Sequence, residues 1–363
     1  MSELSPASFG ASGQGAHDLP FPLWNAQGDG LRHRMMLERL FDGREARWSD
    51  ALIARTRRHV GGCVSAVEMA LKLELERIAV AGLDLAGALS PDHCWRAVQH
   101  KPAILSVTLL RHMRDRAALS LMGQDPLTMP AAIEEIEQQH DFTGDIATQL
   151  SALAYVQTAW RDSGPDYVAM RTDLPAEAMQ DLVWTVAALI AEALMRSDLM
   201  PAVELMPLMD RAGAAVLARH DEGSTPFAQA SLLALQMRAM DLSEDQLVAL
   251  ARGKHILALI AIMSDRNSIE FKHMASLVSE ASEQMLFNMC RAAGFPREVA
   301  VRFVLGRRSI ARGVEDAVLV EYADQYEDMP LEEARASIAG FRLDEIFRDR
   351  LSLLRGLDGG NVR

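Results

Sequence analysis

Two histidine–aspartate pairs are the residues of this chain whose types and spacing come closest to supporting catalysis. A helical phosphohydrolase of the HD type holds its metal with such a pair, an upstream histidine and a later aspartate that converge on one pocket. The candidates here are the pairs His140–Asp141 and His220–Asp221, with His112 upstream and Asp166 or Asp181 downstream. Both pairs also suit helix ends, where histidine favours the last turn and aspartate starts a cap. We favour capping, and metal binding by either pair stays open.

Two further histidines could accept a phosphoryl group if they lay exposed on a helix. His273 follows Glu270 on an expected helix, and His59 follows two arginines. Neither has the surrounding sequence of a sensor kinase, so we expect both to be surface histidines.

Arginine clusters raise the possibility of nucleic-acid binding through phosphate contacts. Residues 31–60 carry eight arginines and four acids, with Arg55, Arg57 and Arg58 close together. A second cluster holds Arg302, Arg307, Arg308 and Arg312. However, the net charge is −13, and residues 121–250 carry 20 acidic but only 6 basic residues. We therefore expect these arginines to dock the acidic middle of the chain or a partner, and nucleic-acid binding through residues 31–60 is the weaker alternative.

Common catalytic motifs are absent from the sequence. It contains no phosphate-binding GxGxxG after a strand, no GxxxxGK[ST], no HExxH and no GxSxG. We assign no catalytic, cofactor-binding or metal-ligating residue, expect no cofactor, and predict that the protein is not an enzyme.

The elements that would position any site are predicted to be helices throughout. Ser243 and Gln246 fit a capping box, and Leu242 and Leu247 can pack across that helix start. The clearest helix is predicted over residues 175–196, where apolar residues recur at helical spacing. Short connections favour antiparallel neighbours, so we predict an all-α fold of stacked antiparallel helix pairs, a right-handed α-solenoid or helical array.

Several interruptions are also predicted. Gly61–Gly62 should break a helix, Pro207 should interrupt another, and Asn267 with Glu270 should form a second capping box. Pro330 should open a final helix that carries Ile346, Phe347, Leu351 and Leu354.

The chain divides into four predicted parts. These are a disordered tail over 1–30, an N-terminal helical region over 31–220, a C-terminal helical region over 227–355 and a loose end over 356–363, although one continuous array is equally compatible. Three cysteines without ligand spacing fit a reducing compartment. No uninterrupted apolar run approaches the roughly 20 residues of a membrane span. We therefore expect a cytoplasmic protein without a membrane span.

Residues 242–306 resemble a known family. The pattern runs from "Leu-Ser-Glu-Asp-Gln-Leu-Val-Ala-Leu-Ala-Arg-Gly" through "Ser-Ile-Glu-Phe" to "Met-Cys-Arg-Ala-Ala-Gly-Phe-Pro-Arg-Glu". It is similar to the uncharacterised bacterial family known as domain of unknown function 2336, over about residues 30–310. The resemblance implies HEAT-like helical repeats, no assigned activity and no site residues.

Together these features favour a non-enzymatic scaffold or adaptor, possibly regulatory, that binds another protein. An HD-type phosphohydrolase or a degenerate relative of one is the first alternative, and nucleic-acid binding is the second.

Overall fold

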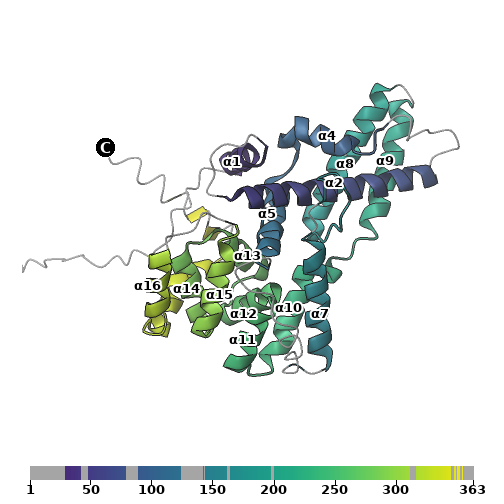
Figure 1. Cartoon of the computed structure of the whole chain (residues 1–363). Helices are drawn as coiled ribbons and strands as arrows, with labels where there is room; N and C mark the ends of the chain where they lie inside the picture. Colours follow the sequence, from purple (N-terminus) through teal and green to yellow (C-terminus); the bar gives the residue numbers. More distant parts are fainter. Residues whose placement is uncertain are drawn as a thin grey trace, which may run out of the picture.

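The computed structural model describes residues 29–41, 48–78, 89–123, 142, 144–161, 164–197, 200–310, 316–344 and the short stretches 347–348, 350–351 and 354. Within this part the chain forms fifteen α-helices and no β-strand (Figure 1). The predicted all-α helical array is therefore confirmed. Residues 1–28 of the predicted tail, His140, Asp141 and the loose end at 356–363 lie outside the described residues.

One group of helices forms the upper half of the molecule in Figure 1. It consists of α1 (Asp29–Phe41), α2 (Asp50–Ile78), α4 (His93–His100), α5 (Val107–Met122), α8 (Ala176–Arg196) and α9 (Ala202–Leu217). The long helix α2 runs across this half and packs against α4, α5, α8 and α9. A 3-10 turn, η1 (Pro102–Ile104), precedes α5.

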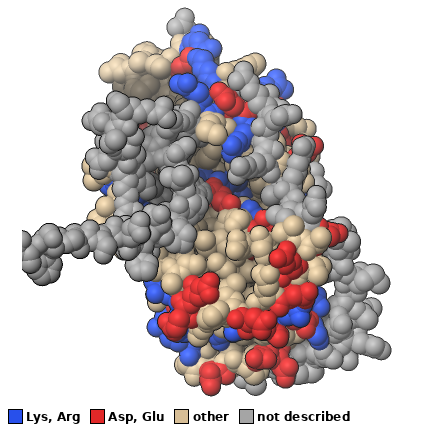
Figure 2. Space-filling view, turned by 90° about the vertical axis from the view of Figure 1, so that its left-hand side faces the viewer, with Lys and Arg blue, Asp and Glu red and all other residues tan. Residues whose placement is uncertain are grey.

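The remaining helices form the lower half. They are α7 (Gly144–Ala159), α10 (Pro226–Arg238), α11 (Glu244–Arg252), α12 (Ile256–Asn267), α13 (Phe271–Glu280), α14 (Glu283–Ala292), α15 (Arg297–Arg307), α16 (Asp316–Gln325) and α17 (Leu331–Ile338). The 3-10 turns η3 (Glu222–Ser224) and η4 (Ala339–Arg342) precede α10 and follow α17. Acidic and basic side chains are mixed over one face of this half (Figure 2).

Two clusters of buried apolar side chains correspond to the two halves. The upper cluster joins α1, α2, α4, α8 and α9, and the lower cluster joins α7 with α10 to α17. Helix α5 belongs to both: Leu109 and Leu110 pack into the upper cluster, while Leu119 and Met122 pack into the lower one. The halves therefore share a helix whose two ends are buried in different cores.

The clearest local predictions are confirmed. Ser243 Oγ accepts the Gln246 amide at 3.2 Å, and the Gln246 side chain accepts the Ser243 amide at 3.0 Å, which completes the capping box of α11. The helix expected over residues 175–196 is α8, and its periodic apolar residues, among them Leu182, Val186 and Ile190, are buried.

The predicted break at Gly61–Gly62 is wrong, because α2 runs through both glycines without interruption. A Cβ on Gly61 would stand 2.4 Å from the carbonyl oxygen of Asp166, and one on Gly62 would stand 2.6 Å from Met170 Cγ. These glycines allow another segment of the chain to lie directly on the helix.

Three further local predictions are wrong. Asn267 ends α12 and donates from its side chain to the carbonyl of Met289 at 3.0 Å, so it does not form a capping box with Glu270. Pro207 lies inside α9, near its exposed start, where water can reach the carbonyl that the missing N–H leaves free. Helix α17 ends at Ile338 and gives way to η4, so the helix after Pro330 carries none of Phe347, Leu351 and Leu354.

Helix α8 has the length and apolar composition of a membrane span, the one such helix among the described residues. Half of its most apolar stretch is buried inside the molecule. A core helix of this kind passes the same test, and α8 packs against α2, α4, α5 and α9.

Candidate functional site

The candidate site is a hollow between α2, α8, α9 and η3, with about 340 Å³ of space. Ala70, Met179 and Val216 form an apolar wall. The polar part of its lining consists of Arg171, Thr172, Asp173, Arg219, His220, Asp221, Ser224 and Thr225. The hollow therefore combines an apolar surface with charged groups from two separate segments of the chain.

One side of the hollow is formed by an extended segment, residues 164–175, which we call the strap. The strap lies across α2 at Gly61 and Gly62, and the Met170 amide donates to the carbonyl of Gly62 at 3.1 Å. Arg58 of α2 donates to the carbonyl of Val168 at 2.7 Å. The strap is not part of a helix or a sheet, so its backbone groups form hydrogen bonds with α2 instead.

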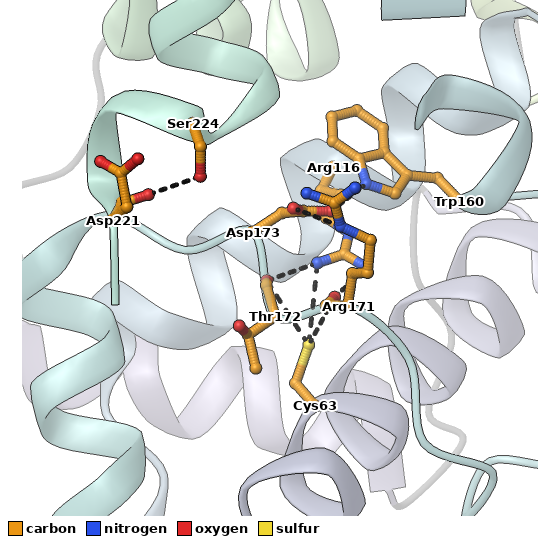
Figure 3. Close-up of polar contacts among 8 residues, drawn as sticks. All are labelled: Cys63, Arg116, Trp160, Arg171, Thr172, Asp173, Asp221 and Ser224. Carbon is orange, nitrogen blue, oxygen red and sulfur yellow. Dashed lines mark hydrogen bonds and ion pairs between the residues drawn. The ribbon is translucent and has the colours of Figure 1, made fainter. Parts of the chain in front are cut away.

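Arg116 of α5 holds the end of the strap by hydrogen bonds to its backbone (Figure 3). Its guanidinium is fully buried and donates to the carbonyls of Thr172 at 2.7 Å and Arg171 at 3.1 Å. The same group lies 5.3 Å above the ring of Trp160. Cys63 Sγ lies 3.7 Å from both carbonyl oxygens, and burial raises the pKa of its thiol. This cysteine is a buried contact and not an activated nucleophile.

Asp173 is held in the left-handed region with a φ of 43°. Aspartate is one of the residues that adopts this conformation, at some cost in backbone energy. Its carboxylate accepts the indole N–H of Trp160 at 3.2 Å and pairs with Arg171 at 3.3 Å. The negative charge of Asp173 is therefore compensated inside the wall of the hollow.

The opposite side of the hollow contains the pair His220–Asp221 in a capping role. Asp221 Oδ1 accepts the Gly223 amide at 3.0 Å, and its carbonyl accepts the hydroxyl of Ser224 at 2.8 Å. Asp221 is the N-cap of η3, as the sequence analysis favours. Arg219 forms an ion pair with the buried carboxylate of Glu74 on α2. Two ion pairs, one from each side, thus flank the hollow.

The other residues of the metal hypothesis lie on other elements and form no metal-binding group with this pair among the described residues. Asp166 pairs with Arg57 at 3.6 Å, and Asp181 lies on α8. His112 is buried against Phe227, with ring centroids 5.0 Å apart, and burial lowers its pKa to about 4. No group of three or more His, Cys, Asp and Glu side chains suited to a metal occurs in the part of the chain that the structure describes.

The histidines considered for phosphotransfer differ in environment. The prediction that His59 is exposed is wrong: it is completely buried, and its Nε2 lies 2.9 Å from the carbonyl of Trp160. Burial, the largest cause, and the nearby Arg116 lower its pKa well below the usual value. His273 is half-buried, with its ring 6.0 Å from that of Phe341.

The prediction that the arginines of residues 55–58 dock the acidic middle of the chain, residues 121–250, is confirmed. Arg55 donates to the carbonyl of Trp160 at 2.9 Å, Arg57 pairs with Asp166, and Arg58 binds Val168. All three contact the strap or the chain just before it. The sequence signal for the contact with the strap was the pair Gly61–Gly62, which starts three residues after Arg58 and admits a close backbone approach.

Comparison with known proteins agrees with the resemblance seen in residues 242–306. A family model described as an uncharacterised protein conserved in bacteria (DUF2336) matches residues 166–339, from the strap to η4. No curated protein and no solved structure matches the chain. Residues 166–339 are therefore similar to the uncharacterised bacterial family DUF2336, and this match starts at residue 166 and not near residue 30 as the resemblance suggested.

Proposed function

We propose that this protein is a non-enzymatic helical scaffold or adaptor that binds another protein in the bacterial cytoplasm. The observation that carries the proposal is the hollow, where an apolar wall adjoins exposed arginines and exposed apolar side chains. Concave sites of this composition suit the anchoring side chain of a partner.

An apolar ridge on α2 extends the hollow. Met69 and Leu73 are exposed, and they are neighbours at i and i+4 on the helix. Leu73 also lies three residues after Ala70, which forms part of the apolar wall. A partner with two or three apolar side chains can cover the ridge and fill the hollow together.

The two arginines of the hollow can form further hydrogen bonds. The side chains of Arg171 and Arg219 are more than half exposed, and each pairs with one carboxylate through one side of its guanidinium. A guanidinium carries five N–H donors. We therefore propose a partner segment in which acidic residues flank an apolar anchor.

The roles of the acidic residues in the lining support a binding function more than a catalytic one. Asp173 accepts a hydrogen bond from Trp160 and forms an ion pair with Arg171, and Asp221 caps η3.

Capture of partners by the full-length protein from cross-linked cells of its own bacterium tests this proposal. We expect a captured protein that Leu73→Asp reduces at least tenfold and that Val320→Asp leaves unchanged. Val320 on α16 is the matched control, because it is 59% exposed and Leu73 is 60% exposed. Equal capture by both variants, or no specific capture, would overturn the proposal.

The metal-dependent alternative needs a separate measurement. Stoichiometric iron, manganese or zinc in the purified protein, lost on His140→Ala, would favour a phosphohydrolase and count against the scaffold.

A further inference from the structure

Asp173 combines a strained backbone with a buried carboxylate in the wall of the hollow (Figure 3). Its φ is 43°, and its side chain is only 5% exposed. The carboxylate accepts the indole N–H of Trp160, a residue that is itself 1% exposed. A left-handed backbone costs energy at residues other than glycine and persists where the surroundings hold it. The position of this carboxylate is therefore set from inside the protein.

The outer partner of the Asp173 carboxylate is Arg171. Asp173 Oδ1 approaches Arg171 at its Nε atom, 3.3 Å away, and within the described part of the chain Asp173 is the one ion-pair partner of this arginine. The edge between the two terminal guanidinium nitrogens is thus left for another group. The side chain of Arg171 is 57% exposed and lines the hollow. Because an ion pair this exposed adds little to folding stability, the arrangement is better explained by what the arginine can bind.

We propose that Asp173 is a positioning residue, which holds Arg171 so that its free edge binds one carboxylate of a partner protein. The edge presents two parallel N–H donors, whose spacing matches the two oxygens of a carboxylate. Because Asp173 already restrains the arginine, less conformational entropy is lost when the partner binds. The inference rests on the proposed function, since it specifies how the hollow recognises the acidic residues of the partner.

The second arginine of the hollow is less suited to this role. Arg219 pairs with Glu74 through Nη2, one of its two terminal nitrogens, so the edge that matches a carboxylate is already partly occupied. Arg171 is engaged only at Nε among the described contacts, and its terminal edge is complete. Arg171 is therefore the better carboxylate site.

The charge of the hollow favours a carboxylate over a phosphoryl group. Its lining contains two arginines and two aspartates, which are Arg171, Arg219, Asp173 and Asp221. These four charges cancel. A phosphoryl group brings nearly two negative charges and a carboxylate brings one, so the carboxylate leaves the occupied site closer to neutral.

Nuclear magnetic resonance of the Arg171 side chain tests the positioning without a partner. We expect relaxation measurements on the wild-type protein to show an Nε–H group as rigid as that of the buried Arg116. Asp173→Asn keeps an oxygen for the Trp160 indole and a residue type that adopts the left-handed region, but it removes the charge beside Arg171. The variant should stay folded by circular dichroism while the Arg171 Nε–H group becomes mobile. A mobile Arg171 in the wild type, or an unchanged one in the variant, would overturn the role of Asp173.

Capture of partners by the full-length protein from cross-linked cells tests the carboxylate site. We expect Arg171→Met to reduce the captured protein by about tenfold or more. Arg171→Lys should restore little of it, because an ammonium cannot hold two oxygens in parallel. Asp173→Asn should reduce capture roughly threefold, the cost of ordering one side chain. Arg196→Met is the matched control, since Arg196 is another exposed arginine paired with one carboxylate, that of Glu192, and it should leave capture unchanged.

The outcomes separate this inference from the proposed function. Capture that Leu73→Asp reduces and Arg171→Met does not would overturn the carboxylate site and leave the proposed function in place. Equal losses in Arg171→Met and Arg196→Met would also overturn it, and so would a captured protein that phosphatase treatment releases. The absence of any captured protein would overturn both proposals.

Discussion

The carbonyl oxygen of Asp166 occupies the space beside Gly61, only 2.4 Å from the position of a Cβ atom there. Alanine at an ordinary helical glycine stabilises a protein by about 1 kcal/mol. Here the same change forces the strap away from α2.

We therefore expect Gly61→Ala to destabilise the fold by about 1–3 kcal/mol, as overpacking does. Urea unfolding followed by circular dichroism measures the difference. Gly223→Ala is the control, because its new atom would meet only the flexible side chain of Asp221, at 3.2 Å. A stabilised Gly61→Ala protein would contradict the close packing of the strap.

Arg116→Met should be among the most damaging substitutions in the chain. It leaves the carbonyls of Arg171 and Thr172 without their buried donor. Each buried unsatisfied group costs about 1–3 kcal/mol, so we expect a loss of about 2–6 kcal/mol in the free energy of unfolding. Arg196→Met removes only an exposed ion pair with Glu192 and should cost less than about 1 kcal/mol. Similar losses for the two variants would show that Arg116 does not hold the strap.

His255 should make stability depend on pH in the acidic range. Burial lowers its pKa to about 4 from the usual 6.5. The unfolded chain therefore takes up a proton at a higher pH than the folded chain does. The stabilisation is complete above pH 6.5 and is lost as pH falls towards 4, by about 3 kcal/mol.

His255→Phe keeps a planar ring at this position and removes the titration. Urea unfolding at intervals between pH 7 and pH 4 should show a shallower decline in the variant than in the wild type. Equal slopes would mean that the pKa of His255 is not lowered in the folded protein.

The three cysteines provide a chemical test of the fold. Cys63, Cys94 and Cys290 are all buried and unpaired. Burial raises the pKa of each thiol, that of Cys290 to about 12. We expect a thiol reagent to label none of them rapidly in the native protein, and to label three in urea. Fast labelling of any cysteine without denaturant would contradict its burial.

Local features of the fold were predictable where neighbouring residues decide them. The capping box of Ser243 depends on residues three positions apart, and α8 depends on a continuous apolar face. The path of α2 through Gly61 was not predictable in this way, because the strap that covers it lies about 105 residues further along the chain.

The candidate site was predictable only in part. The sequence indicated His220–Asp221 as a cap, and that interpretation is confirmed. It gave no sign that this cap faces Arg171 and Asp173, since their proximity depends on how the strap crosses α2 and α5. Similarly, Arg116 is one of several charged residues in α5, and its hydrogen bonds to the strap distinguish it from the buried Arg114 and Asp115.

The place of α5 in the core affects which fragment of the chain should be chosen for expression. The matched region begins at residue 166, after α5 and α7 have ended, although both helices fill the core of its lower half. A fragment trimmed to 166–339 would lose Leu119, Met122, Leu150 and Leu153 from that core, and the arginine that fastens its first residues. The segment that matches the family model is therefore shorter than the segment that contains the complete hydrophobic core. A fragment for expression should include the complete core.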